Sequence, residues 1–162
     1  MSNKYAHMAS VRMTIHTFQQ EIWLPAAPDR VFAFFAAPRN LEAITPPWLK
    51  FEIVTRGNIV MREGATIDYR LSLRRIPLRW RSEITVWEPG RCFVDEQRRG
   101  PYRSWRHTHT FSDLDGGTLC GDLVEYSVPG GPLVDRLFVR RDLAAIFAYR
   151  TAALARQYSP GG

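Results

Sequence analysis

The sequence predicts an α+β domain in which a curved antiparallel sheet of about six to seven strands is covered by one long C-terminal helix. Stretches of alternating apolar and polar residues, separated by turn signals, fill the middle of the chain. A long amphipathic pattern then closes it. The 162 residues suit one domain with its own core, and 45% hydrophobic and 23% charged residues are typical of globular proteins. This composition excludes a disordered chain and a coiled coil.

The domain is expected to span residues 11–158, between a flexible N-terminal tail at 1–10 and a short tail at 159–162. Alternating apolar and polar residues predict a first strand from Val11 to Leu24, and Pro25 ends it. Pro28 then suits the first turn of a short helix, which Pro38 stops. A second short helix is expected at residues 41–45, before two consecutive prolines.

The next segments alternate with the period of two that is typical of half-buried strands. Turn signals such as Pro89-Gly90 and Asp115-Gly116-Gly117 separate them. The predicted strands cover residues 51–55, 66–73, 77–87, 91–98, 102–111 and 118–127.

Residues 132–157 form the clearest helical pattern. Its apolar positions recur at steps of three and four residues and are Leu133, Leu137, Phe138, Ile146, Phe147 and Leu154. The arginines of this segment, Arg150 among them, are assigned to its exposed side. At 1.5 Å per residue the helix would be about 37 Å long. It is therefore long enough to cover one face of the sheet.

Several local motifs resemble the START-related helix-grip superfamily, also called SRPBCC or polyketide cyclase/dehydrase-like proteins. The motifs include Ile44-Thr45-Pro46-Pro47-Trp48-Leu49, Trp87-Glu88-Pro89, Gly100-Pro101-Tyr102 and Trp105-Arg106-His107-Thr108-His109. The resemblance covers nearly the whole chain. It implies a helix-grip fold with a deep cavity between sheet and helix, and a lipid-like, quinone-like, aromatic or polyketide-like ligand.

Strand alternation places unusual polar residues on the face that should point inward. Three consecutive strands each contribute two of them: Asp95 and Gln97, His107 and His109, Asp122 and Tyr126. Because an unpaired buried polar group costs about 1–3 kcal/mol, a purely structural core would avoid this arrangement. The cluster therefore indicates a polar end to an apolar cavity, suited to a carbonyl or hydroxyl of a ligand.

The leading hypothesis is a binding protein for a hydrophobic or aromatic small molecule. The candidate ligand-binding residues are Trp48, Tyr69, Trp80, Phe93, Gln97, Trp105, His107, His109, Tyr126 and Phe138. A structural role is the alternative for each of them: Asp–His pairs across strands can fix register, and large aromatic residues commonly fill cores.

An enzyme is the second hypothesis, with a cyclase, dehydratase or hydrolase as the reaction class. His107 would act as the general acid or base, and Asp95 or Asp122 would orient it. The His-x-His pair with one aspartate could also hold zinc, but such a pair alone is weak evidence, so no metal and no cofactor are assigned. No nucleophile motif, phosphate loop or dinucleotide fingerprint occurs.

The charge balance supports a third hypothesis, an interaction module. Lys plus Arg is 22 and Asp plus Glu is 16, so the net charge is +6. Outward arginines on the sheet could contact RNA, an anionic membrane or a partner protein, although an ordinary solvated face is favoured. No apolar run approaches the roughly 20 residues that span a bilayer, and residues 1–10 carry no apolar signal core. We expect a cytoplasmic protein with two free thiols, Cys92 and Cys120.

Overall fold

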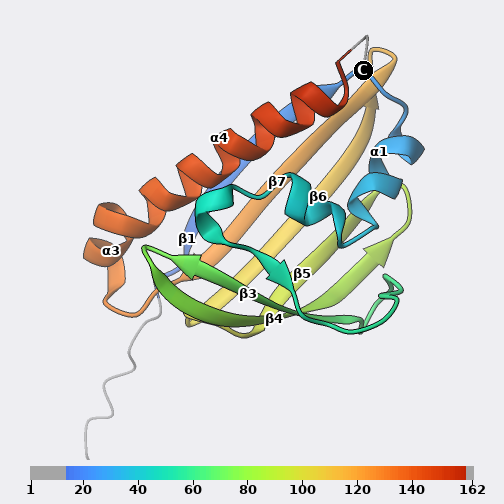
Figure 1. The fold of residues 1–162 in the computed structure, drawn as a ribbon. Coiled ribbons are helices and arrows are strands. Elements are labelled where there is room, and N and C mark those ends of the chain that lie inside the picture. The colour runs from blue at the N-terminus through green and yellow to red at the C-terminus, as the bar shows by residue number, and fades with distance from the viewer. Residues whose placement is uncertain (1–13, 160–162) are drawn as a thin grey trace, which may run out of the picture.

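A seven-stranded antiparallel sheet and a long C-terminal helix form the fold (Figure 1). The structure is a computed structural model that describes residues 14–159. The predicted tail at 1–10 and the predicted strand start at Val11 lie outside these residues, as do residues 160–162 of the predicted tail at 159–162. The strands are β1 (His16–Leu24), β2 (Glu52–Ile53), β3 (Thr66–Leu73), β4 (Ile76–Glu88), β5 (Cys92–Arg99), β6 (Ser104–Leu114) and β7 (Gly117–Ser127).

The helices fall into two groups. The first group is α1 (Pro28–Phe35), α2 (Asn40–Ala43) and the short 3-10 turn η1 (Pro47–Leu49). The second is α3 (Gly131–Val134), the π-helical turn η2 (Asp135–Val139) and α4 (Arg140–Gln157), which follow one another without a break. Apart from η1, which the sequence does not predict, both groups lie where the sequence predicts helices, so the α+β helix-grip prediction is confirmed.

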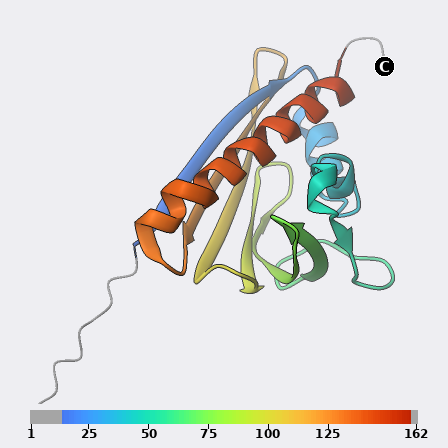
Figure 2. The ribbon, with the colours of Figure 1, turned by 60° about the vertical axis from the view of Figure 1, so that its left-hand side comes forward.

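The strand order, β1-β7-β6-β5-β4-β3-β2, brings the first strand beside the last. The sheet curves, and α4 crosses its concave face diagonally (Figures 1 and 2). The register sets His109 opposite Asp122 on β7 and His107 opposite Asp95 on β5. Polar residues that are far apart in the sequence therefore meet on the inner face at the centre of the sheet.

The inward face that strand alternation predicts is buried or half-buried, and the alternation itself fails at one place on β4. A register shift between Ile84 and Val86 interrupts the β4–β5 ladder. Alternation from Trp80, Ser82 and Ile84 predicts that Val86 faces inward. Beyond this bulge the alternation reverses, so Trp87 packs against the core instead. The ring of Trp87 lies 5.1 Å from Phe32 and 5.7 Å from Phe93, centroid to centroid.

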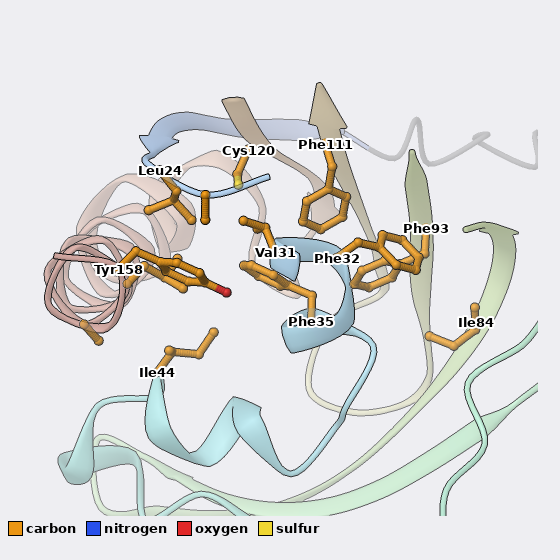
Figure 3. Close-up of a cluster of buried hydrophobic side chains, with 13 residues drawn as sticks. Leu24, Val31, Phe32, Phe35, Ile44, Ile84, Phe93, Phe111, Cys120 and Tyr158 are labelled. Carbon is orange, nitrogen blue, oxygen red and sulfur yellow. The ribbon is translucent and has the colours of Figure 1, made fainter. Parts of the chain in front are cut away.

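An aromatic cluster attaches α1 to the sheet. Phe32 and Phe35 of α1 meet Phe111 of β6 at centroid distances of 5.3 and 5.1 Å, in the edge-to-face geometry that aromatic rings favour. Figure 3 shows these rings, with Phe93, gathered beside the helix. Pro28 starts α1 without losing a hydrogen bond, since the first backbone amides of a helix have no partner inside it.

The buried face of the C-terminal helix differs from the predicted one. Leu143, Phe147 and Leu154 are buried against the sheet. The predicted apolar positions Leu133, Leu137 and Phe138 are exposed instead, at 67%, 46% and 44%. The π-helical turn η2 rotates the helix face relative to a regular α-helix. The α-helical period therefore does not predict which side chains before α4 face the sheet. Within residues 14–159, no helix is both long and apolar enough to cross a membrane.

Candidate functional site

A partly open cavity of about 170 Å³ lies between the inner face of the sheet and α4. Its wall is largely apolar, with many aliphatic side chains and with aromatic ones that include Tyr69, Trp80, Phe93, Trp105 and Phe147. An apolar protein cavity of about 150 Å³ can hold benzene, so this volume suits a ligand of one or two rings.

The aromatic wall is held in place by contacts among its own rings. Tyr69 and Trp80 stack with their ring centroids 5.9 Å apart, and Trp105 meets Trp80 edge-on at 5.3 Å. The indole N–H of Trp80 donates to Ser82 Oγ at 3.1 Å, and the Tyr69 hydroxyl lies 3.0 Å from the same oxygen. The wall therefore has a fixed shape before any ligand enters.

Four buried or nearly buried side chains at the sheet centre, Asp95, His107, His109 and Asp122, form what we call the polar cluster. His107 Nε2 lies 2.8 Å and His109 Nδ1 lies 3.1 Å from the same Asp122 oxygen, Oδ1. On the other side, Asp95 Oδ2 is 3.2 Å from His109 Nε2 and 3.7 Å from His107 Nδ1. Each imidazole thus stands between two carboxylates.

The pKa values of the two imidazoles in the polar cluster are shifted in opposite directions. Burial lowers the pKa of His107, and the neighbouring His109 lowers it further. Burial also acts to lower the pKa of His109, but hydrogen bonding to Asp122 and Asp95 outweighs it and raises this pKa. Burial acts to raise the pKa of each aspartate, yet the imidazoles hold both below the usual range, Asp122 well below. His109 is therefore the more basic of the two imidazoles.

Ser82 ties the polar cluster to the aromatic wall. Its hydroxyl donates to Asp95 Oδ1 at 3.2 Å while accepting the hydrogen bond from Trp80. The other carboxylate oxygen of Asp95, Oδ2, faces the two histidines. Asp95, His107 and His109 also line the cavity, so the polar cluster forms one of its ends.

Arg150 is a cavity residue that the sequence analysis assigned to the exposed side of the helix. Its side chain is only 12% exposed, and its guanidinium lies over the Phe147 ring at 4.9 Å. Nε and Nη1 are buried without a hydrogen-bond partner, and Nη1 stays 3.7 Å from Asp122. The sequence does indicate this position, because steps of four, three and four residues place Arg150 on one helix face with Leu143, Phe147 and Leu154.

Two predicted ligand residues have structural contacts instead. Gln97 donates to the backbone carbonyl of Tyr102 at 2.8 Å and accepts from its amide at 3.3 Å. Tyr126 is fully buried and donates to Asp135 Oδ1 at 2.6 Å, which attaches β7 to the π-helical turn. Neither lies in the cavity wall, since both side chains are used to hold neighbouring segments in place.

Two further candidates lie outside the cavity. Trp48 is 55% exposed and packs edge-on against Tyr149 of α4. Phe138 is exposed beneath the guanidinium of Arg74, because the π-helical turn directs it away from the sheet. The other six candidates line the cavity: Tyr69, Trp80, Phe93, Trp105, His107 and His109.

The outward arginines are largely paired with acidic residues. Arg81 makes a bidentate contact with Asp68, and Arg98 pairs with Glu83 and Glu96. Arg106 bridges Glu96 and Glu125. These pairs offset part of the positive charge on the face that the interaction hypothesis would use.

The cysteines offer no reactive group near the cavity. Both are free thiols, and Cys120 is buried in the core beside Leu24 and Phe111. Burial raises the pKa of Cys120 to about 12, so it stays protonated at neutral pH.

Comparison with known families now adds to this geometry. Residues 24–145, well over half of the chain, match the family described as "Polyketide cyclase / dehydrase and lipid transport". The chain belongs to this family. Membership confirms the resemblance found in the sequence and supports hydrophobic ligand binding in general terms. A search of curated proteins finds no match.

Solved structures share the fold at low sequence identity. Protein CV1439 from Chromobacterium violaceum is 16% identical with a TM-score of 0.70, over 89% of this chain and 97% of that one. The major latex-like protein 151 from Panax ginseng is 11% identical with a TM-score of 0.67, over 90% and 99%. Protein Ms6760 from Mycobacterium smegmatis is 17% identical with a TM-score of 0.65, over 87% and 89%. These similarities establish the fold.

Proposed function

We propose that the protein binds a compact aromatic small molecule that carries an oxygen acceptor, such as a carboxylate, at one end. Arg150 is the observation that carries this proposal. A buried guanidinium with two unpartnered donor atoms is costly, and a ligand oxygen would relieve that cost. Charge-assisted hydrogen bonds from arginine to a carboxylate are among the strongest in proteins.

The remaining cavity supports the same ligand chemistry. Aliphatic and aromatic side chains line most of the wall, and the aromatic faces suit flat rings. The charged side chains lie at the end where Arg150 and the polar cluster meet. The volume of about 170 Å³ favours a quinone-sized or small polyketide-like ring system over a long lipid chain. Family membership supports a hydrophobic ligand in general.

A matched pair of probes tests the proposal by calorimetry. 2-Naphthoate and 2-naphthalenemethanol share a ring system and differ in the carboxylate. We expect both to bind the native protein, and the carboxylate to bind about tenfold tighter or more, which corresponds to about 1.4 kcal/mol. Arg150→Met should remove this preference while the alcohol still binds.

Arg156→Met is the matched control, because Arg156 lies on the same helix with its side chain exposed. It should leave both affinities unchanged. Failure of both probes to bind the native protein would contradict ligand binding altogether. Equal affinities for the two probes would contradict the assignment of Arg150 alone.

An acid–base reaction is the second candidate function, favoured by the 2.8 Å contact between His107 Nε2 and Asp122. This contact fixes one nitrogen of the ring and leaves Nδ1 on the side of Asp95 and the cavity. Such a nitrogen could accept a proton from a bound ligand. Turnover of an aromatic ketone or hydroxy compound by native protein, lost in Asp122→Asn, would support this candidate.

A further inference from the structure

We propose that Asp95, His107 and His109 form a binding site for a first-row divalent transition-metal ion. Two imidazoles and one carboxylate are a donor set that suits zinc and its neighbours. In the sequence, the His-x-His pair alone is weak evidence for a metal, because it does not show where the nitrogen lone pairs point. The structure adds that information, and the inference does not depend on the proposed ligand.

The spacing of the three donor atoms fits one ion. Metal–ligand distances of about 2.1 Å in a tetrahedral site place neighbouring ligand atoms about 3.4 Å apart. Asp95 Oδ2 lies 3.2 Å from His109 Nε2 and 3.7 Å from His107 Nδ1, on either side of that value. Donor atoms of all three residues lie within 4.8 Å of one another.

Asp122 supplies the outer contacts that metal-binding histidines usually have. Its Oδ1 lies close to the remaining nitrogen of each ring, 2.8 Å from His107 Nε2 and 3.1 Å from His109 Nδ1. A histidine that gives one N–H to a carboxylate presents the lone pair of its other nitrogen to a metal. Both rings are therefore turned so that their other nitrogens, His107 Nδ1 and His109 Nε2, converge on Asp95.

Asp95 is oriented in the same manner. Ser82 donates to Oδ1 at 3.2 Å, which leaves Oδ2 as the oxygen that faces the histidines. Each of the three metal-binding residues thus has an outer hydrogen-bonding partner, an arrangement that fixes geometry before the ion arrives. On binding, the ion would replace the proton of the His109 Nε2–Asp95 hydrogen bond, and that proton would be released to solvent.

The site would be open on one side. The three residues line the cavity, so a fourth coordination position faces the space that a ligand would fill. Sites with three protein ligands and one open position are typical of zinc enzymes, whereas structural zinc sites are closed by four protein ligands. An oxygen of a cavity ligand could complete the coordination.

Cobalt(II) and zinc(II) salts alone, added to native protein that carries no histidine tag, test the site. We expect one equivalent of Co²⁺ to bind and to give visible absorption bands of a nitrogen and oxygen site. The thiolate charge-transfer band that Cys92 or Cys120 would produce should be absent. One equivalent of Zn²⁺ should displace the cobalt, and X-ray absorption of the zinc protein should show two imidazoles and no sulfur.

Variants then locate the ion. Asp122→Asn should weaken zinc binding about 10–100-fold, the usual effect of removing an outer carboxylate. His109→Gln should weaken it more, while His7→Ala and His16→Gln leave it unchanged. Lack of saturable binding by native protein at 100 µM Zn²⁺ would overturn the proposal. Sulfur ligation in the X-ray spectrum would overturn it as well, without any variant.

Discussion

Arg150 shows how one residue changes the interpretation of the whole site. Its charge favours a solvent-exposed position, yet its spacing from Leu143, Phe147 and Leu154 sets it on the buried face of α4. Spacing prevails because a helix that covers a sheet must bury whatever lies on its inner stripe. Residues whose charge and position disagree in this way are expected at functional sites.

The inward histidines and aspartates could be predicted from the sequence because strand alternation is a local property. His107, His109 and Asp122 are all buried on the predicted face. Their mutual distances could not be predicted, because these depend on the register between β5, β6 and β7. One residue of register shift would have separated Asp122 from His109.

Tyr126 illustrates a polar residue that the sequence could not assign correctly. Its hydroxyl contacts Asp135 in the π-helical turn, a partner set by tertiary structure. We predict that Tyr126→Phe lowers the free energy of unfolding by about 1–3 kcal/mol, because a buried carboxylate oxygen loses its donor. Chemical denaturation measures this loss. Tyr149→Phe should change stability by less than about 0.5 kcal/mol, and an equal loss in both variants would contradict the assignment.

At the scale of elements, the β3–β4 hairpin has a contact that local sequence does not indicate. Its two turn residues, Arg74 and Arg75, have φ angles of 51° and 69°, as the tight primed turns of hairpins require. Asn and Gly are the usual residues there. Arg74 instead makes two 2.9 Å hydrogen bonds to Asp142 of α4, which attach the hairpin tip to the helix.

We predict that this contact controls local opening of the hairpin. Asp142→Asn should change the free energy of unfolding by less than about 1 kcal/mol, since both partners are partly exposed. Amide hydrogen exchange at Ile76, beside the turn, should accelerate by up to roughly fivefold, the equivalent of about 1 kcal/mol. Asp113→Asn, on an exposed part of β6, should leave that rate unchanged. Unchanged exchange in Asp142→Asn would show that the contact does not restrain the hairpin.

The bulge on β4 and the π-helical turn are two features that the sequence does not predict. Both insert a residue into a regular period, so the faces of Trp87 and Phe138 differ from those that simple alternation gives. Such irregularities follow from packing between elements and leave no clear local signal. The elements themselves, in contrast, lie close to their predicted positions because period and turn residues are encoded locally.

At the scale of the molecule, the order of strands and the final helix sufficed to predict the fold. An antiparallel sheet with one apolar face needs a cover, and only the last helix is long enough to provide it. The size of the cavity is a different kind of property. It depends on how bulky side chains from β3, β4, β6 and α4 pack together, and this packing cannot be predicted from any single segment of the sequence.

Protein NMR of the tryptophan side chains gives the most direct test of ligand binding in this cavity. Five tryptophans give separate indole N–H signals. Trp80 and Trp105 line the cavity, whereas Trp23 and Trp48 are exposed elsewhere and serve as internal controls. On titration with 2-naphthoate, the signals of Trp80 and Trp105 should shift to saturation, while the chemical shifts of Trp23 and Trp48 stay unchanged. Unchanged signals for Trp80 and Trp105, or shifts confined to Trp23 and Trp48, would contradict a ligand-binding cavity.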